Sequence, residues 1–479
     1  MITVVWFRQD LRVHDQPLLH EAARLGNPVV PLYLLPRRWT EPGPQGMDRL
    51  GPAKAAFLQE CLADLASSLD AMGLTLITAV TEPAALLGHW HRSTPLQVVT
   101  AEADAPEEQA DLAALRAMGI PVHEVGSRTL LCASALPWGA SFPATFSRFR
   151  KQVERDAGPS ASLPEGQAPT VMGAQPLSLP QGTDSVVATL TARRGRWQRN
   201  TQDYFSLTGG EQAARDWLQQ YLFADRHIAH YKSTRNQLIG AGYSSRLSAA
   251  LAWGCVSVRH VWHAILAYEQ RFGSSQHSYW LRFELLWREF FHWSMRAHGV
   301  QAFRYAGLRL FDPAPSRLTS SPANASRHWQ AWCTAQTGLP FIDANLKELM
   351  ATGYLSNRGR QNLASFLIHD LGLDWRWGAC WFEHHLVDHD VASNWGNWAY
   401  IAGVGHDAQG GRRFSPTRQW WRHDPQAEYV RYWLPALANA SREQILQLHF
   451  PMERDFRNAA FPDYPAPILA LPDSDREVP

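Results

Sequence analysis

The sequence has 479 residues, enough for two or three domains that each bury a hydrophobic core. Its 45 Lys and Arg nearly balance its 44 Asp and Glu, which excludes a polybasic tail and a globally cationic nucleic-acid binder, so any DNA contact must use a local patch. The five cysteines form no Cys-x-x-Cys pair, which argues against a zinc ribbon or disulfide framework and predicts reduced core residues.

Residues 1–132 alternate short apolar runs with longer helical patterns. Helical patterns cover Pro52–Met72 and Pro106–Met118, and the strand-like runs are Ile2–Phe7, Val29–Leu35, Leu74–Val80, Leu96–Thr100 and Val122–Val125. This alternation predicts a doubly wound α/β domain with a parallel sheet covered on both faces. The domain contains neither Gly-x-Gly-x-x-Gly nor a Gly-x-x-x-x-Gly-Lys-Ser/Thr phosphate loop, so its fold alone identifies no nucleotide.

The N-terminus carries charge at Arg8 and Asp10, and no apolar run approaches the roughly 20 residues that span a membrane. We therefore expect a soluble, cytoplasmic protein without a membrane partner. We also expect a monomer.

The rest of the chain divides into three parts. Residues 133–203 are predicted to be an interdomain linker, because residues 158–203 are rich in Pro, Gly, Ser and Gln and lack a hydrophobic period. Residues 204–440 are predicted to form an all-α domain, and the 21 Trp, concentrated after position 250, suit a helical core, base stacking or electron transfer. Residues 441–479 are predicted to be an extension wrapped loosely over the surface. The linker arginines predicted to be solvated are Arg193, Arg194, Arg196 and Arg199.

The segment Tyr279–Met295 has the pattern of an amphipathic helix. Side chains three, four and seven apart share a helix face, so one stripe holds Trp280, Glu284, Trp287, Arg288 and Phe291. One interpretation is a core stripe with a Glu284–Arg288 pair. The other is the wall of a base-binding pocket, where an aromatic ring stacks and Glu284 hydrogen-bonds an extruded base.

Three further segments bring polar side chains together, by helical spacing or at the start of a helix. Helical spacing brings together Asn357, Arg360 and Gln361, and a later segment gathers Asp388, Asp390, Asn394 and Asn397 beside Trp398. The acids could hold a metal, but no His-x-x-x-His or His-Glu-x-x-His accompanies them, and the neighbouring Trp and Gly favour a large planar ligand, so we expect no metal. Ser244 and Ser245 precede a helical run and would either cap it or bind a phosphate.

Together and in this order, the segments resemble the FAD domain of the cryptochrome/photolyase superfamily. They are Tyr231-Lys-Ser-Thr-Arg-Asn, Ser244-Ser-Arg-Leu-Ser, Phe283-Glu-Leu-Leu-Trp-Arg-Glu-Phe-Phe, Ser356-Asn-Arg-Gly-Arg-Gln-Asn, Asp374-Trp-Arg and Ser393-Asn-Trp-Gly-Asn-Trp. Val5-Trp-Phe-Arg-Gln-Asp-Leu-Arg-Val-His-Asp resembles the start of the family's antenna domain, so the likeness spans nearly the whole chain. It implies an α/β antenna domain followed by an all-α FAD-binding domain.

The resemblance implies a bent FAD held by helices. The residues it assigns to FAD are Tyr231, Ser244, Ser245, Arg246, Leu247, Ser248, Arg288, Asn357, Arg360, Asp388, Asp390 and Asn394. Asn394 falls where the family contacts flavin N5, and a neutral amide there favours a fully reduced flavin, since a nearby carboxylate would disfavour its negative charge.

The resemblance also assigns residues to damaged DNA. The catalytic residues would be Glu284, Asn357 and Asn394, and the DNA-binding residues Arg235, Glu284, Trp287, Arg358, Gln361 and Tyr400, with Trp287 as stacking platform. Gln361 and Tyr400 stand where duplex-acting photolyases carry bulkier contacts, which resembles the DASH class. A weaker lesion pocket offsets less of the few kcal/mol needed to flip a dimer out of a duplex, which favours single-stranded DNA.

Electron transfer and light harvesting are implied by the same resemblance. Trp398 and Trp375 match the proximal and middle tryptophans of the family's relay, but Pro322 stands at the distal position. Trp329 is the predicted substitute, with Trp381 and Trp395 as alternatives. The antenna would be 5,10-methenyltetrahydrofolate between the domains, with Glu107 and Glu108 as its carboxylate site. The sequence Gly405-His-Asp replaces the usual Gly-Asn-Asp, so this loop near the DNA face is expected to behave differently.

The implied function is blue-light-driven repair of cyclobutane pyrimidine dimers in single-stranded DNA, by electron transfer from photoexcited reduced FAD to the dimer and back. The alternative is a blue-light photoreceptor without repair activity, in which photoreduction changes a surface read by a signalling partner. The residues do not separate these two. A thermally driven flavin oxidoreductase is disfavoured because no nicotinamide fingerprint is present.

Overall fold

Five parallel strands form one sheet in the order β3-β2-β1-β4-β5. The strands are β1 (Ile2–Phe7), β2 (Val29–Leu35), β3 (Ile77–Val80), β4 (Leu96–Ala101) and β5 (Val122–Val125). The predicted parallel sheet is confirmed, but β3 begins three residues later than predicted. Gly73, with φ of 74°, lies in the turn after the preceding helix, and Leu74 N donates to Leu69 O, so strand pairing starts only at Ile77. The computed structural model describes residues 1–43, 45–139, 141–156, 169–199, 207–308, 321–407, 411–449 and 461–471.

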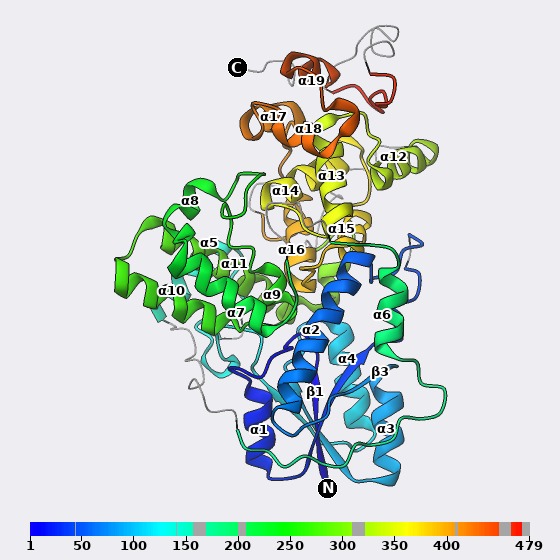
Figure 1. Cartoon of the computed structure of the whole chain (residues 1–479), viewed down its shortest axis with the longest axis vertical. Coiled ribbons are helices and arrows are strands. Elements are labelled where there is room, and N and C mark those ends of the chain that lie inside the picture. The colour runs from blue at the N-terminus through cyan, green and yellow to red at the C-terminus, as the bar shows by residue number, and fades with distance from the viewer. Residues whose placement is uncertain are drawn as a thin grey trace.

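Helices cover both faces of the sheet (Figure 1). They are α1 (Pro17–Leu25), α2 (Pro52–Asp70), α3 (Pro83–Ser93) and α4 (Pro106–Ala117). Successive strand residues point to opposite faces, so Val4 and Trp6 pack with α3 and α4 while Val5 and Phe7 pack with α1 and α2. The core on the second face continues into the helical half of the chain, which fixes the two halves against each other.

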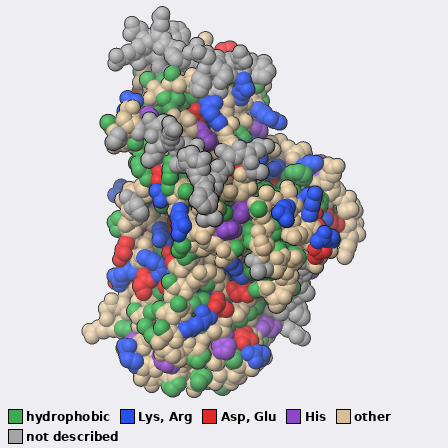
Figure 2. Space-filling view, turned by 180° about the vertical axis from the view of Figure 1, so that it is seen from behind, with side chains coloured by type: hydrophobic (Ala, Val, Ile, Leu, Met, Phe, Trp, Pro, Cys, Tyr) green, Lys and Arg blue, Asp and Glu red, His purple; other side chains and the backbone are tan. Residues whose placement is uncertain are grey.

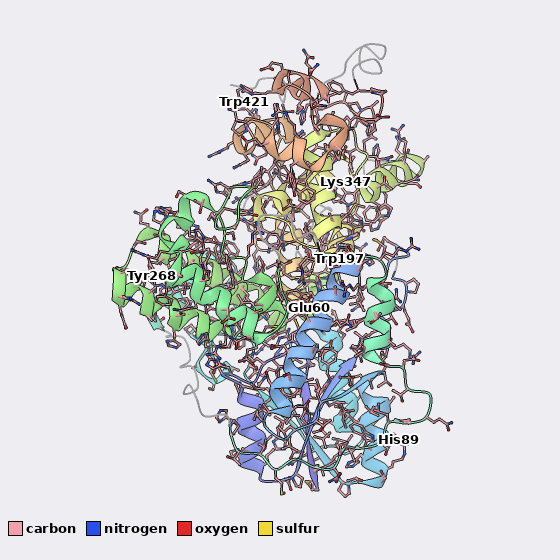
Figure 3. The ribbon with its side chains drawn as sticks, viewed as in Figure 1. Glu60, His89, Trp197, Tyr268, Lys347 and Trp421 are labelled. Carbon is pink, nitrogen blue, oxygen red and sulfur yellow. The ribbon has the colours of Figure 1, made fainter. Side chains whose placement is uncertain are left out.

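Two helices lie inside the predicted linker, α5 (Phe146–Asp156) and α6 (Val186–Arg194). α6 packs along α2 and buries Val186 and Leu190, so the prediction that this stretch lacks hydrophobic periodicity is wrong. Two arginines predicted to be solvated are paired: Arg193 with Asp48, and Arg199 Nη2 with Glu60 Oε2 at 2.6 Å. Glu60 is labelled in Figure 3. The linker boundary predicted at residues 203 and 204 lies outside the described residues.

The second half of the chain is helical, as predicted. Its helices are α7 (Glu211–Gln219), α8 (Tyr231–Thr234), α9 (Ser248–Ala252), α10 (Val258–Phe272), α11 (Gln276–His298), α12 (Pro322–Thr334), α13 (Pro340–Thr352), α14 (Asn357–Ser365), α15 (Trp375–His385), α16 (Val391–Ile401), α17 (Pro416–His423), α18 (Glu428–Trp433) and α19 (Arg442–Leu448). No strand occurs in the described residues from 207 onward. α17, α18 and α19 lie at the end of the molecule opposite the sheet (Figure 1).

The C-terminal extension is packed where the structure describes it. Ile445 and Leu448 on α19 are fully buried, and Tyr464 Oη donates to Asp343 Oδ2 at 2.7 Å. The expectation of a loose wrap is therefore wrong for these residues. Residues 450–460 and 472–479 of the predicted extension lie outside the described residues.

Buried carboxylates join the two halves. Glu211 accepts from Val13 N at 2.7 Å, and Glu289 accepts from Leu130 N at 2.8 Å. Neither glutamate is singled out by the sequence. Cys61 and Cys255 are buried as expected, whereas Cys333 and Cys380 are half-buried and Cys132 is exposed.

The surface carries mixed charge. On the face shown in Figure 2, Lys and Arg side chains are interspersed with Asp and Glu where grey atoms do not cover them. In the described part of the chain, no helix combines the length and the apolar character needed to cross a bilayer.

Candidate functional site

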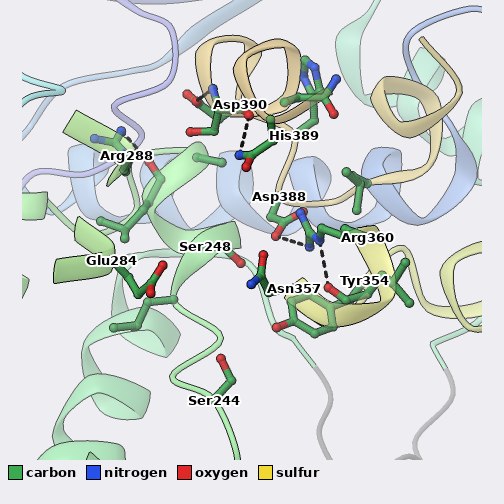
Figure 4. A pocket seen from close by; sticks show the side chains of 18 of the residues that line it. Ser244, Ser248, Glu284, Arg288, Tyr354, Asn357, Arg360, Asp388, His389 and Asp390 are labelled. Atoms are coloured by element: carbon green, nitrogen blue, oxygen red, sulfur yellow. Dashed lines mark hydrogen bonds and ion pairs between the residues drawn. The ribbon is translucent and has the colours of Figure 1, made fainter. Parts of the chain in front are cut away.

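A pocket opens among α8, α9, α11, α14, α15 and α16, segments that lie far apart in the sequence (Figure 4). Every residue predicted to contact FAD lines this pocket. Glu284, Gln361 and Trp398 line it as well. The predicted cofactor residues are therefore brought together in one place by the fold.

The serines enter the pocket from a bend that precedes α9. α9 begins at Ser248 after Leu247 as N-cap, so the prediction that Ser244 or Ser245 caps this helix is wrong. Arg246, which follows Ser245, has a φ angle of 50°, an uncommon conformation for a residue with a side chain. Its guanidinium lies 5.2 Å from the centre of the Tyr354 ring, which holds a cation beside the serine hydroxyls.

Arg360 and Asp388 form an ion pair on the pocket wall. Arg360 Nη2 donates to Asp388 Oδ2 at 2.7 Å (Figure 4). The other carboxylate oxygen, Oδ1, and Gln361 Oε1 are buried without a hydrogen-bond partner among the described residues. Buried acceptors left unpaired are costly, so both call for donors from a ligand. The hydroxyl and ring N–H groups of FAD are donors of this kind, and the arginines suit its pyrophosphate, so these residues fit the cofactor.

Asp390 caps α16 and belongs to a buried chain of charges. It accepts from Ser393 N at 2.7 Å, and its Oδ2 lies 3.1 Å from His292 Nε2. His292 Nδ1 lies 2.7 Å from Asp104 Oδ2 in the α/β domain. Burial raises the pKa of Asp390, but His292 and Arg288 lower it more, so the net pKa falls well below the ordinary value. Asp390 therefore brings a fixed negative charge to the pocket.

His292 is a site residue that sequence reasoning missed. It is fully buried on α11, where its neighbours Phe291 and Trp293 read as core residues. Burial lowers the pKa of His292, but Asp390 and Asp104 raise it further, so the net pKa is raised. Only the fold brings the two aspartates to this imidazole, so no spacing in the sequence could have indicated it.

Glu284 pairs with Arg235, not with Arg288. Arg288 instead donates through Nη1 to Arg128 O at 2.7 Å, so the predicted pair within the helix is wrong. Burial raises the pKa of Glu284, and the Arg235 charge opposes this without reversing it. Glu284 lines the pocket, which favours the pocket-wall interpretation of its stripe over the core interpretation.

Two amides occupy other parts of the wall. Asn394 Nδ2 donates to Ala379 O at 3.0 Å, which holds the amide against α15. Asn357 begins α14 after Ser356, whose Oγ accepts from Gly359 N. Both side chains line the pocket.

The other predicted DNA contacts lie around the pocket rather than in its lining. Trp287 and Tyr400 touch at 5.9 Å between ring centres. Phe146 of α5 stacks on Trp287 at 3.7 Å, with the ring planes 10° apart, so one indole face is already covered. A base could use only the uncovered part of Trp287 as a platform. Phe146 was not among the residues predicted from the sequence. Arg358 donates through Nη2 to Asn236 Oδ1 at 3.2 Å.

Of the predicted relay tryptophans, Trp398 lines the pocket and Trp375 begins α15. Trp398 packs closely on α15, because a Cβ on Gly378 would lie 2.2 Å from its Cη2. Trp329 contacts Trp377 at 5.6 Å between ring centres. In the described part of the chain, no ring contact joins Trp329 to Trp375.

Glu107 and Glu108 both line a small cavity of about 50 Å³ beside Arg38 and Trp39, but only Glu107 also lines a larger one. Glu107 lines a cavity of about 510 Å³ between the two halves of the chain and lies 2.8 Å from Arg49 Nη1. Glu108 does not line that cavity; its oxygens accept from Asp104 N and from Arg128 Nη1, both at 2.8 Å. Glu108 therefore holds its own loop and Arg128, and it lines only the smaller cavity.

Other residues lining the pocket were not singled out by the sequence. They are Leu251, Ala252, Leu281, Leu285, Tyr354, Leu355, Ala364, Phe382, Leu386, His389, Ser393 and Ile401, whereas Asn397, which the sequence did single out, lines the pocket too. Most are apolar side chains whose helical period also suits a core. Among the described residues, no three His, Cys, Asp or Glu side chains are grouped so as to hold a metal ion.

Two family models match different parts of the chain. Residues 3–169 match the family model "DNA photolyase", and residues 280–478 match "FAD binding domain of DNA photolyase". A cryptochrome DASH from Gloeobacter violaceus is 37% identical, over 98% of this chain and 93% of the relative. The crystal structure of a Synechocystis cryptochrome matches with a TM-score of 0.87 and 32% identity, covering 100% of this chain and 99% of the other.

A bacterial class III photolyase from Agrobacterium tumefaciens matches with a TM-score of 0.78 and 28% identity, covering 99% of this chain and 95% of the other. The matches therefore cover both the α/β and the helical half. The chain belongs to the cryptochrome DASH family of the cryptochrome/photolyase superfamily, and its helical half is an FAD-binding domain of the photolyase type.

Proposed function

We propose that this protein binds FAD and uses blue light to repair cyclobutane pyrimidine dimers, preferentially in single-stranded DNA. The observation that carries the proposal is the position of Glu284 on the wall of the same pocket that gathers every predicted FAD contact. FAD in its reduced form would supply the light-driven electron, and the protein supplies position and electrostatics.

The pocket side chains divide the work of holding FAD. Arg246 and the serine hydroxyls provide charge and donors suited to a pyrophosphate. Asp388, held by Arg360, presents its free oxygen to ligand hydroxyl or N–H groups. Asn394 places a neutral amide on the wall, which tolerates a negatively charged reduced flavin better than a carboxylate would.

Glu284 is suited to recognise a base. Its carboxyl oxygens line the pocket and can accept a hydrogen bond from a pyrimidine ring N–H. Arg235 holds this side chain from outside the pocket lining. The ion pair with Arg235 would therefore hold the Glu284 carboxyl group in a fixed position for an extruded base.

The preference for single strands is supported by Gln361 and Tyr400. Gln361 offers a small polar contact at the pocket, and Tyr400 is held against Trp287 by an edge contact. A polar amide and a phenol in place of bulkier apolar contacts at these two positions would offset less of the few kcal/mol that flipping a dimer from duplex costs.

We also propose that the cavity between the domains holds the folate antenna 5,10-methenyltetrahydrofolate, with Glu107 rather than Glu108 as its carboxylate. Glu107→Gln should lower antenna content while FAD content stays at the wild-type level. We further propose that the protein acts as a monomer, which sedimentation analysis of the holoprotein tests.

Repair rates on three substrates test the proposed function. Chemically reduced protein is illuminated with the same dimer in a single strand, in a duplex, and in a duplex with an unpaired bubble around the lesion. We expect fast repair on the single strand, slow repair on the duplex, and recovery of most of the difference in the bubble. Equal rates would contradict the strand preference. No repair of any substrate, with FAD bound and photoreduction intact, would favour the photoreceptor alternative.

A further inference from the structure

The tryptophans around the FAD pocket offer three routes by which an electron could reach Trp398 from outside the protein. Pro322 is the first residue of α12 and supplies no aromatic ring at the predicted distal position. Electron transfer between side chains is fastest where aromatic rings are in contact. A useful route therefore needs ring contacts and an end that a reductant can reach.

One route runs through Trp381 and Trp332. Their ring centres lie 5.9 Å apart, and Trp381 connects toward Trp398 through Phe382. However, Trp381 is 1% exposed and Trp332 is 0% exposed. This route ends in the hydrophobic core, where no reductant has access.

A second route would use Trp377 and Trp329, whose ring centres lie 5.6 Å apart. Trp377 is two residues after Trp375 on α15, a spacing at which helix side chains do not face each other. Within the described residues, the structure shows no ring contact from Trp375 to either member of this pair. The pair is partly exposed, but it lacks the connection to the relay.

The third route is Trp395. Its ring centre lies 5.6 Å from that of Trp375 at an interplanar angle of 78°, an edge-to-face contact. It stands three residues before Trp398 on α16, so both side chains share one helix face. Trp395 also lines the cavity between the domains, beside Phe303. Trp395 is itself only 8% exposed, but of the tryptophans compared it alone both contacts Trp375 and lines a cavity.

We propose that Trp395 is the outer electron donor of this protein and that it meets its reductant in the cavity between the domains. This inference rests on the proposed binding of FAD. With FAD bound, Trp398 would supply one electron to the photoexcited cofactor and Trp375 would replace it, as the family resemblance implies, and Trp375 would in turn recover an electron from Trp395, which its ring contacts. The Trp395 radical cation then takes one electron from an external thiolate, and two such thiyl radicals combine as a disulfide.

The position of Trp395 has a consequence for the proposed antenna. Glu107 and Trp395 line the same cavity from opposite domains. A ligand bound there would cover the indole and restrict the approach of a thiol. The occupant of the cavity would therefore control how quickly the Trp395 radical is repaired.

The test compares Trp395→Phe, Trp395→Tyr and Trp329→Phe in the full-length FAD-loaded protein with dithiothreitol present. After a laser flash, transient absorption measures the yield and lifetime of aromatic radicals, and FAD content is measured on the same samples. We expect Trp395→Phe to lower the long-lived tryptophanyl yield by an order of magnitude. Trp395→Tyr should restore a long-lived signal with a tyrosyl spectrum, which a packing role would not produce. Trp329→Phe should match the wild type.

An unchanged long-lived radical yield in Trp395→Phe would overturn the inference, as would a large loss confined to Trp329→Phe. If Trp395→Phe loses its FAD, the Trp395→Tyr protein decides, because absence of a tyrosyl signal at wild-type FAD content also overturns it. A wild-type protein that binds no FAD would instead overturn the proposed function. If FAD binds normally and replacing Trp395 leaves the radical yield unchanged, only this inference is overturned and the proposed function stands.

Discussion

His292 Nε2 lies 3.1 Å from Asp390 Oδ2, and both side chains are buried where α11 meets the start of α16. The same imidazole reaches Asp104 through Nδ1 at 2.7 Å, so one side chain connects the α/β domain with the wall of the FAD pocket. Arg128 lies 3.2 Å from Asp104 and balances part of the negative charge. The pocket charge at Asp390 is therefore fixed from the other domain.

His292→Gln should destabilise the fold strongly. Removing one partner of a buried ion pair typically costs about 3–5 kcal/mol, and here two carboxylates lose the same cation. The matched control is Arg24→Gln, which removes an exposed pair with Glu21 and should barely change stability. The unfolding temperatures of both variants measure the difference. Equal decreases in unfolding temperature would contradict a central role for the buried Asp104–His292–Asp390 chain.

The stabilising effect of His292 should depend on pH in both directions. Its pKa is raised in the folded state, so its contribution is complete below the ordinary histidine value of about 6.5 and is lost as pH rises through the raised value. The pKa of Asp390 is lowered, so its contribution is complete above about 3.9 and is lost on further acidification. The difference in unfolding temperature between wild type and His292→Gln should peak between these values. A difference independent of pH would argue against the charged pair.

Glu284→Ala should reduce repair strongly while leaving FAD content nearly unchanged. The lost hydrogen bond to a buried base is worth about 1–3 kcal/mol, and the ion-pair partner of Glu284 is Arg235, which is not one of the predicted FAD contacts. Glu269→Ala is a suitable control, since Glu269 lies 3.3 Å from Arg282 on α11 and does not line the pocket. Parallel loss of FAD and repair would make Glu284 a structural residue.

Arg360→Ala should lower FAD occupancy, because it leaves Asp388 buried without its cation and removes one pocket wall. The wild-type protein should release FAD, and not FMN, on denaturation. Arg376→Ala breaks a comparable Arg–Asp pair, with Asp374, outside the pocket and should keep full occupancy. Flavin absorbance per protein, followed by chromatography of the released flavin, gives the measurement. Full occupancy in Arg360→Ala would contradict the assigned contact.

Gly378→Ala should displace Trp398. The added methyl group would lie 2.2 Å from the indole Cη2, so the ring must move, and overpacking of this kind costs about 1–3 kcal/mol. We expect a lower unfolding temperature and slower photoreduction. Gly126→Ala is the control, since the nearest atom to its added methyl would be 3.8 Å away. Normal photoreduction in Gly378→Ala would show that the packing of Trp398 on α15 is not required.

Sequence alone predicted correctly those residues whose arrangement depends on near neighbours in the chain. The strands of the sheet follow from apolar runs, and the pocket side chains on α14 and α16 follow from helical spacing. The failed predictions concern partners from distant segments. Glu284 pairs with Arg235 on the preceding segment, although Arg288 stands at the ideal spacing on its own helix.

The same reason explains the missed residues. His292 and Glu289 lie among apolar neighbours on α11, and their partners Asp390, Asp104 and Leu130 N come from segments far away in the sequence. Trp329 was predicted as the outer relay residue, but contact with Trp375 belongs to Trp395. Phe146 lies in a stretch whose composition predicted a linker, yet it covers one face of Trp287.

The most direct test of the proposed activity is the number of thymines restored per bound flavin when reduced protein and dimer-containing single-stranded DNA are illuminated with blue light. Wild-type protein should restore many thymines per flavin in the light and none in the dark, and Glu284→Ala should restore far fewer at equal FAD content. A wild-type protein that holds reduced FAD, binds the strand and restores no thymines under illumination would contradict the proposed repair activity.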